Sequence, residues 1–460
     1  MHMRYLLFCD IDLQTPEVIM KILFLSLGCD KNLVDSEVML GMLTSRGYEI
    51  TDDENEADVI IINTCCFIHD AMEESIQNIL DMAEYKKNGK AKALIVTGCL
   101  AQRYRQEILD EIPEVDEVLG TTAIDQIIRA VDQALEGKKE VILSDLNALP
   151  LPDARRAVST GGHFAYLKIA EGCDKHCTYC IIPKLRGAYR SIPMEYLLKE
   201  AQELADQGVK ELILVAQETT LYGKDIYGEK SLHRLVRELC RINGIQWIRI
   251  LYCYPEEITD ELIQVMKEEK KVCHYLDLPI QHANDQVLKR MGRRTTKQEL
   301  IDIVHKLRKE IPDICLRTTL ITGFPGETRE QHEELMEFVD EMEFDRLGVF
   351  TYSPEEGTPA AEMPDQIDQE VKEERQAELM ELQQEVAFDK AGEMKGREVL
   401  VMIEGKVADE NAYVGRTYRD APNVDGLIFI NTEEELVSGD FVKVEVTGAL
   451  DYDLIGGLVE

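Results

Sequence analysis

The sequence predicts a multidomain α/β protein with an N-terminal parallel sheet, a central partial (β/α)6 barrel and a small C-terminal β-barrel. Two series of alternating strand and helix patterns, separated by a stretch without periodicity, indicate the first two domains. Short strand patterns with glycine at their turns indicate the third. With 460 residues the chain is long enough for two or three separate hydrophobic cores.

The first series contains short β-branched runs, each followed by an amphipathic helical pattern, at residues 22–27, 59–62 and 93–96. Alternation of this kind is typical of a parallel sheet, and we expect one α/β domain over residues 20–145. Residues 146–163 contain Pro and Asn and lack periodicity, so we expect a linker there.

The second series contains six strand patterns, near residues 165–169, 211–216, 247–251, 275–280, 316–321 and 346–351. A complete eight-unit barrel needs roughly 250 residues, so the six units over residues 164–390 predict an open barrel. Residues 366–394 are charged and periodic, which predicts an outer helix with Val371, Leu379, Leu382 and Val386 on its buried face.

Residues 391–460 contain five short strand patterns, at 399–403, 413–417, 427–430, 441–446 and 454–459. Glycines stand at the turns between them. This pattern predicts a small closed β-barrel.

The formal charge of −37 and the sequence pI of about 4.6 make nucleic acid an unfavourable partner and a basic protein a favourable one. An acidic composition that serves solubility alone explains the charge equally well. Twelve cysteines are too few for a disulfide scaffold and indicate a reducing cytoplasm. We expect no membrane span, because no apolar run approaches 18 to 20 residues.

The sharpest motif is Cys173-x3-Cys177-x2-Cys180, directly after the first strand of the predicted barrel. Three thiolates hold three corners of a four-iron cluster and leave one iron open for another ligand. Spacing alone favours iron–sulfur chemistry. A closed zinc site that uses His176 as fourth ligand remains the alternative.

A second cysteine set is dispersed along the chain. Cys29, Cys65 and Cys99 each follow a predicted N-terminal strand, and the carboxyl ends of parallel strands share one edge of a sheet. They therefore predict a second cluster with an open position. Taken singly, each cysteine is as readily a small buried packing residue, and Cys66 competes with Cys65 for the same role.

Other strand ends of the predicted barrel are polar or contain glycine. They can hold the amine, ribose and carboxylate of a cofactor, although ordinary loop residues fit the same positions. The residues concerned are Gln217, Glu218, Gln281, His282, Gly323 and Pro325. The basic run at residues 289–294 either binds an acidic group or, as we favour, forms a solvated helix end.

Together these residues resemble the radical S-adenosylmethionine (SAM) methylthiotransferase family from about residue 20 to the C-terminus. The resemblance rests on the following motifs: Ser26-Leu27-Gly28-Cys29 with Asp35-Ser36-Glu37, Asn63-Thr64-Cys65, Gly98-Cys99-Leu100-Ala101-Gln102-Arg103, Glu171-Gly172-Cys173 through Cys180 followed by Pro183 and Arg186-Gly187, and Gly323-Phe324-Pro325-Gly326-Glu327-Thr328. The C-terminal barrel is similar to a TRAM domain, which makes substrate binding its expected role.

The resemblance implies two 4Fe–4S clusters and SAM as cofactors. It places the SAM-cleaving cluster on Cys173, Cys177 and Cys180, and the auxiliary cluster on Cys29, Cys65 and Cys99. It also makes Tyr179 and the polar strand-end residues the expected SAM contacts. An electron from the first cluster then cleaves SAM to a deoxyadenosyl radical, and the auxiliary cluster delivers a methylated sulfur. Flavodoxin or ferredoxin is the expected electron donor.

Two branches of the family differ in substrate: an aspartate of small-subunit ribosomal protein S-twelve, or an adenosine beside the tRNA anticodon. Residues 391–460 contain six Lys or Arg and fifteen Asp or Glu, a formal charge of −9, which favours the basic protein over tRNA. Residues 27–37 and 415–426 also resemble the ribosomal protein branch. A non-enzymatic iron–sulfur scaffold or ribosome-binding factor is a weaker alternative, because it leaves the open cluster corner without a purpose.

Overall fold

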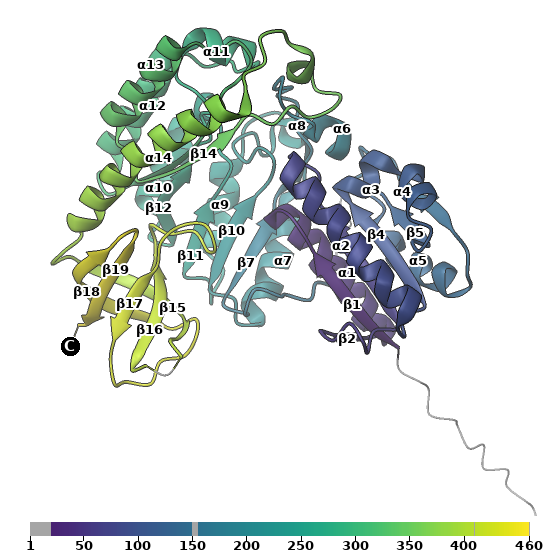
Figure 1. Cartoon of the computed structure of the whole chain (residues 1–460). Coiled ribbons are helices and arrows are strands. Elements are labelled where there is room, and N and C mark those ends of the chain that lie inside the picture. The colour runs from purple at the N-terminus through teal and green to yellow at the C-terminus, as the bar shows by residue number, and fades with distance from the viewer. Residues whose placement is uncertain (1–19, 150–154, 409, 460) are drawn as a thin grey trace, which may run out of the picture.

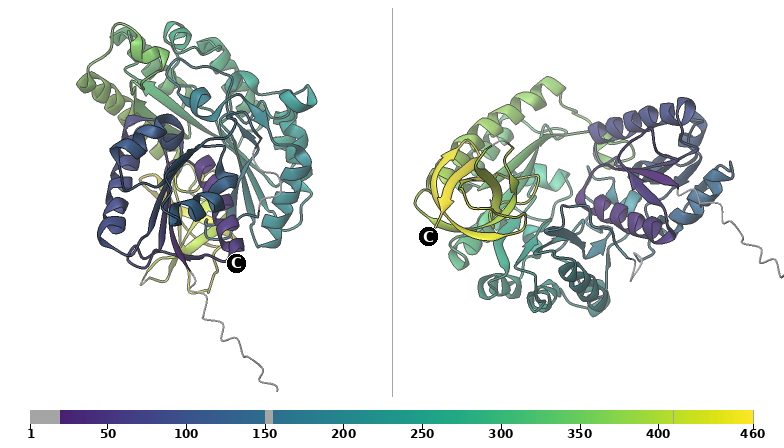
Figure 2. Two further views of the ribbon diagram at one scale, coloured as in Figure 1. Left: turned by 90° about the vertical axis from the view of Figure 1, so that its right-hand side faces the viewer. Right: turned by 90° about the horizontal axis from the view of Figure 1, so that it is seen from below.

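The computed structural model describes residues 20–149, 155–408 and 410–459. They form two six-stranded sheets, a closed five-stranded barrel and a short two-stranded ribbon (Figure 1). The central sheet, with its helices, joins the N-terminal sheet to the C-terminal barrel, and these two units lie at opposite ends of the curved central unit (Figure 2). The predicted fold class is therefore confirmed.

The N-terminal sheet is entirely parallel and has the order β2-β1-β3-β4-β5-β6. Its strands are β1 (Lys21–Ser26), β2 (Glu49–Thr51), β3 (Val59–Thr64), β4 (Ala93–Gly98), β5 (Glu117–Leu119) and β6 (Glu140–Ile142). We did not predict β2, β5 or β6, because three residues are too short to show a period.

Helices cover both faces of this sheet, as the buried run of β3 requires. Val59 and Ile61 face α1 (Asp30–Arg46) and α5 (Ile127–Leu135). Ile60 and Ile62 face the opposite helices, since successive strand residues alternate sides. Those helices are α2 (His69–Asn88), α3 (Cys99–Tyr104) and α4 (Gln106–Glu111), and the 3-10 turn η1 (Ile124–Gln126) precedes α5.

The central sheet is also parallel and has the order β14-β13-β12-β11-β10-β7, so its strands follow one another around an open barrel. These strands are β7 (Phe164–Lys168), β10 (Glu211–Val215), β11 (Trp247–Ile250), β12 (Val272–Asp277), β13 (Cys315–Thr322) and β14 (Arg346–Thr351). The ribbon consists of β8 (Ala170–Glu171) and β9 (Arg190–Ser191).

The helices that accompany these strands form the outer layer. They are α6 (Ile182–Arg186), α7 (Met194–Asp206), α8 (Lys224–Tyr227), α9 (Leu232–Cys240), α10 (Asp260–Glu268), α11 (Asp285–Arg290), α12 (Lys297–Glu310), α13 (Arg329–Met342) and α14 (Gln369–Gly392). Two 3-10 turns, η2 (Pro255–Glu257) and η3 (Pro359–Glu362), lie in connections.

The inner face of the open barrel is closed by parts of the other two units. Ile213 and Trp247 of the barrel pack there with Val34 of α1 and with Met402 of the C-terminal barrel. Burial of large apolar side chains stabilises such contacts by about 1.5–3 kcal/mol each. Residues of all three units therefore share this one hydrophobic cluster, in addition to the core that each unit has of its own.

The predicted buried face of α14 is wrong by about one position. Only Leu379 of the four predicted residues is fully buried, and the buried stripe also contains Lys372, Arg375 and Gln383. Gln383 donates to the Phe344 carbonyl at 2.8 Å. Because α14 packs on edge strand β14, its long polar side chains reach backbone carbonyls, and this contact sets the helix rotation.

The C-terminal barrel closes in the order β15-β16-β17-β19-β18. Its strands are β15 (Glu398–Lys406), β16 (Ala412–Thr417), β17 (Ile428–Asn431), β18 (Phe441–Leu450) and β19 (Asp453–Leu458). Their inner faces form a separate core that includes Val401, Ile430 and Val444. In the described part of the chain, no helix is both long and apolar enough to cross a membrane.

Candidate active site

The N-terminal cysteines follow three neighbouring strands. Cys29 follows β1 and caps α1, Cys65 follows β3, and Cys99 begins α3 directly after β4. Since β1, β3 and β4 are adjacent and parallel, the three cysteines lie at one edge of the sheet. Gly28 has a φ of +86°, and a Cβ there would lie 2.9 Å from the Cys65 Sγ. This close approach requires glycine.

The pKa values of these thiols are raised partly by one another, as expected for three thiols that lie close together. Burial raises the pKa of Cys65 to about 12, and the nearby Cys99 and Cys29 thiols raise it further. Burial also raises the pKa of Cys99, while the Arg186 guanidinium opposes that shift. Like-charged thiolates repel one another, so a metal ion or cluster is needed to hold all three deprotonated.

Cys66 has a different environment from Cys65. It is fully buried in the apolar core between the sheet and α2–α4, together with Ile62 and Leu100. Burial raises its pKa, and Cys99 adds to the shift. These contacts favour Cys65 over Cys66 as a ligand, and the assignment stays a prediction.

The second cysteine set lies in the loop that follows β8. Cys173 and Cys177 are buried, and burial raises the pKa of Cys173 to about 12. Thr178 fixes the loop: its backbone N–H donates to the Met291 carbonyl at 2.9 Å, and its hydroxyl donates to the Arg290 carbonyl at 2.8 Å. His176, the proposed fourth ligand of a zinc site, is exposed.

The basic run at residues 289–294 is only partly the solvated helix end that we favoured. Arg293 is buried, and its guanidinium lies 4.3 Å from the Tyr254 ring centroid. The Tyr254 hydroxyl is 3.8 Å from the Cys177 Sγ. Arg290 donates to the Gly326 carbonyl at 3.0 Å. Two of the four basic residues thus support the cysteine loop, a role that spacing in the sequence cannot show.

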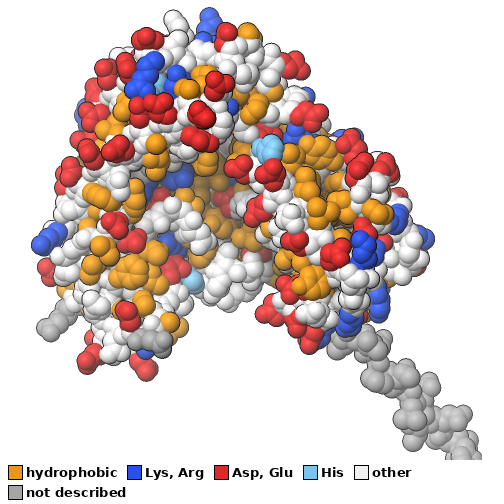
Figure 3. Space-filling view, viewed as in Figure 1, with side chains coloured by type: hydrophobic (Ala, Val, Ile, Leu, Met, Phe, Trp, Pro, Cys, Tyr) orange, Lys and Arg blue, Asp and Glu red, His pale blue; other side chains and the backbone are white. Residues whose placement is uncertain are grey.

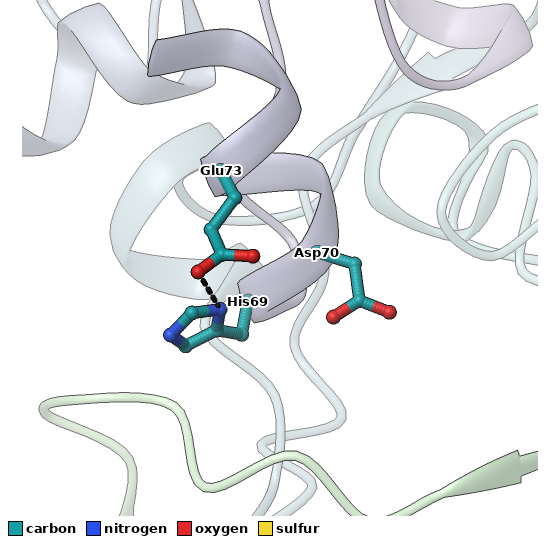
Figure 4. Close-up of side chains that lie close together, drawn as sticks. All are labelled: His69, Asp70 and Glu73. Carbon is teal, nitrogen blue, oxygen red and sulfur yellow. Dashed lines mark ion pairs between the residues drawn. The ribbon is translucent and has the colours of Figure 1, made fainter. Parts of the chain in front are cut away.

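Neither cysteine set has the compact geometry of a single-ion site. Three thiolates around one tetrahedral zinc at about 2.3 Å lie about 3.8 Å apart. Among the described residues, only His69, Asp70 and Glu73 place three ligand atoms within 4.8 Å of one another. These three are exposed surface side chains at the start of α2 (Figure 4). Iron–sulfur clusters rather than zinc at the two cysteine sets stay a prediction.

Two buried side-chain oxygens without hydrogen-bond partners lie beside the second cysteine set. Gln217 donates to Glu171 at 2.7 Å, but its Oε1 is buried without a hydrogen bond within the described structure. The same holds for Oε2 of Glu218, which lies 3.6 Å from the Lys175 ammonium. Burial raises the pKa of Glu218 to about 7, although Lys175 opposes the shift. Orphaned polar atoms of this kind fit a polar cofactor such as SAM.

The other predicted SAM contacts lie at the ends of β12 and β13. Gln281 pairs with β13 through its backbone, and Tyr179 packs edge-on against Phe324. Gly323 and Phe324 donate their N–H groups to the Glu327 carboxylate, at 2.5 and 3.0 Å, so the loop containing Gly323 and Pro325 is held from within.

His282 lies beneath this loop. It is fully buried, with its Nε2 3.9 Å from Glu327 Oε1. Burial raises the pKa of Glu327, but the nearby imidazoles of His282 and His332, together with the Arg375 guanidinium, outweigh burial and lower it to about 2. His282 therefore contacts Glu327, the residue that holds the loop containing Gly323 and Pro325. A contact between His282 and SAM stays a prediction.

A buried charge network joins the two cysteine sets, and the sequence motifs that contain Asp35, Glu171 and Arg186 gave no indication of these contacts. Lys168 of β7 contacts both Asp35 of α1 and Glu171 of β8. Arg186 of α6 donates to Asp35 at 2.7 Å and to the Asn32 side chain at 2.8 Å. Burial alone raises the pKa of Glu171, but Lys168 and Arg186 hold it well below its usual range. Two cations therefore balance two carboxylates at the contact between the units.

A cavity of about 400 Å³ opens where the three units meet. It is lined by Cys29 from the N-terminal unit, by Tyr252 and Arg317 from the central barrel, and by residues 421–424 from the C-terminal barrel. Figure 3 shows the molecule hollowed between the N-terminal unit and the C-terminal barrel. Cys29 is exposed, and it faces this cavity.

An open parallel barrel with Cys-x3-Cys-x2-Cys after its first strand, beside orphaned polar groups, defines a radical SAM enzyme. The profile of the radical SAM superfamily matches residues 167–339, the TRAM domain matches residues 396–459, and uncharacterized protein family UPF0004 matches residues 21–120. The chain is 64% identical over 437 residues to ribosomal protein uS12 methylthiotransferase RimO of Lachnoclostridium phytofermentans, covering 95% of this chain and 99% of that protein. It is 50% identical to RimO of Desulforamulus reducens over a similar span, 95% of this chain and 99% of that protein. The chain belongs to the RimO family of radical SAM methylthiotransferases, and it uses SAM and an iron–sulfur cluster.

Solved structures agree at the level of the fold. The radical SAM methyltransferase TsrM from Kitasatospora setae, solved with cobalamin and a 4Fe–4S cluster, gives a TM-score of 0.54 at 14% identity, covering 74% of this chain and 77% of that one. The cobalamin-dependent SAM radical enzyme OxsB gives a TM-score of 0.51 at 13% identity, with coverage of 79% and 56%.

Proposed function

We propose that this enzyme adds a methylthio group to the β-carbon of an aspartate in small-subunit ribosomal protein uS12. The observation that carries the proposal is the identity of 48–64% to RimO proteins over at least 95% of the chain. The acidic composition supports it, because a formal charge of −37 attracts a basic ribosomal protein and repels tRNA.

The two cysteine sets suit two 4Fe–4S clusters. Cys173, Cys177 and Cys180 would hold the cluster that cleaves SAM, and Cys29, Cys65 and Cys99 would hold the auxiliary cluster. When bound, these groups supply the electron for SAM cleavage and the sulfur for transfer. This gives the proposed domains of the chain. Residues 20–145 form the domain that holds the auxiliary cluster, and residues 146–163 form the linker. Residues 164–390 form the domain that cleaves SAM, and residues 391–460 form the domain that binds the substrate.

The protein's own residues position the reactants and exclude water. Gln217 and Glu218 offer acceptors to the SAM amine or ribose hydroxyls beside Cys173. The network of Asp35, Lys168 and Arg186 fixes the separation of the two cysteine sets, and precise separation matters for transfer to a carbon. A reduced flavodoxin or ferredoxin in a reducing cytoplasm is the proposed electron source.

A tRNA adenosine remains the second candidate substrate, since the same chemistry serves both. The test is tandem mass spectrometry after anaerobic reconstitution with SAM, sulfide and reductant, with uS12 or unmodified tRNA as substrate. A methylthio gain on one uS12 aspartate supports the proposal. A gain only on tRNA contradicts the substrate assignment and leaves the chemistry intact.

A further inference from the structure

The cavity between the three units contains a single positive charge. Among the described residues that line it, Arg317 is the only Lys, Arg or His, while Asp30 and Asp277 are carboxylates. Cys29 lines the same cavity. A ligand group held by Arg317 is therefore placed in the space that adjoins the auxiliary cysteine set.

Arg317 keeps hydrogen-bonding capacity for a ligand. Its Nη1 donates to Asp277 at 2.9 Å, and its Nε lies 3.5 Å from Asp425. In the described structure Nη2 makes no hydrogen bond. The side chain is 19% exposed, whereas those of Asp277 and Asp425 are 5% and 3% exposed. A guanidinium has five N–H donors in a planar fork, so a further carboxylate can be bound.

We propose that Arg317 binds the side-chain carboxylate of the substrate aspartate and so selects the residue to be modified. This inference rests on the proposed function. A carboxylate that leaves water for a cavity needs a cation and hydrogen-bond donors. In aspartate the β-carbon is bonded directly to the carboxyl carbon, so a carboxylate on Arg317 brings that carbon into the cavity lined by Cys29. Tyr166 and Tyr252 are among the other residues that line this cavity.

Arg346 provides a matched control. It is the direct neighbour of Arg317 in the pairing of β13 with β14, and it also contacts the C-terminal barrel, through Asp420 at 2.5 Å. Its side chain is 14% exposed, but it does not line the cavity. Loss of Arg346 removes a comparable ion pair between the central barrel and the C-terminal barrel, but it leaves the proposed carboxylate contact in place.

The experiment measures binding of uS12, and of uS12 with the target Asp changed to Asn, to the reconstituted full-length protein by calorimetry. Wild type and R346M should bind the Asp form at least about tenfold more tightly than the Asn form, because Asn loses the charge-assisted bonds. R317M should bind both forms within about twofold of each other. R317Q is a second neutral variant with the same expected result if R317M does not fold.

The inference is overturned if wild type does not distinguish Asp from Asn, or if R317M and R317Q keep the wild-type preference. Failure of the proposed function looks different, because wild type would then transfer no methylthio group to uS12. If wild type transfers the methylthio group normally and R317M keeps the preference for Asp, then Arg317 does not bind the substrate carboxylate, and the proposed function is unaffected.

Discussion

Nη1 of Arg186 in α6 donates to Oδ2 of Asp35 in α1 at 2.7 Å. Asp35 lies six residues after Cys29, and Arg186 lies six residues after Cys180. Both side chains are almost completely buried, at 4% and 2% exposure. This ion pair is thus a direct mechanical connection between the two cysteine sets.

Removing the guanidinium should destabilise the protein strongly. R186M leaves Asp35 and Glu171 with Lys168 as their only close cation in the described network, and breaking a buried pair in this way costs about 3–5 kcal/mol. Chemical unfolding of the apoprotein measures the loss.

The surface pair Arg237–Glu268 is the control for R186M. Its atoms are 2.7 Å apart, but the side chains are 44% and 48% exposed, so R237A should cost at most about 1 kcal/mol. If R186M and R237A lower the free energy of unfolding equally, then the buried network does not stabilise the contact between the two cysteine sets.

Single cysteine substitutions should separate the two cluster sites. Wild type should contain about eight iron atoms, and C65A or C177A should retain about four, because each loses one four-iron cluster. C66A should retain about eight, since Cys66 packs in the apolar core. Iron analysis with Mössbauer spectroscopy provides the measurement, and iron loss in C66A equal to that in C65A would identify Cys66 as a ligand.

SAM affinity should depend on pH through Glu218. Burial raises the pKa of its carboxyl to about 7, so the group loses its charge below that pH and accepts hydrogen bonds less well. The dissociation constant of wild type for SAM should rise by up to about tenfold per pH unit below pH 7. E218Q should bind more weakly at pH 8 and show a flat profile. The same pH dependence in both proteins would exclude Glu218 as a SAM contact.

Apoprotein stability gives an independent check on Glu218. The unfolded carboxyl ionises from about pH 4.5 and the folded one only near 7, so wild type loses stability as pH rises through this window. E218Q lacks this linkage and should gain stability relative to wild type between pH 5 and 8. A constant difference across this range would contradict the raised pKa.

Association with uS12 should depend on the acidic C-terminal barrel. Glu433, Glu434 and Glu435 are exposed, and their replacement by Lys reverses the local charge. The KM for uS12 should rise by about tenfold at low salt, with a smaller rise at high salt. Replacement by Gln should give an intermediate effect. An unchanged KM in both triple variants would show that the charge of the C-terminal barrel does not contribute to substrate recognition.

The sequence predicted the elements that are long enough to show a period, including all six central strands and both cysteine sets at strand ends. The rotation of α14 was predicted wrongly, because Lys372 and Gln383 reach backbone carbonyls that only the folded β14 and its neighbours present. Arg293 was similarly misinterpreted, since its partner Tyr254 is distant in sequence. Contacts of this kind depend on tertiary placement, which local patterns do not encode.

The most direct test of the proposed activity is the mass of uS12 from cells that lack this gene, compared with cells carrying the wild-type gene or its C177A variant. We predict that the methylthio group on the uS12 aspartate is absent after deletion, returns with wild type, and stays absent with C177A. A uS12 protein that remains methylthiolated in the deletion strain would contradict the central claim.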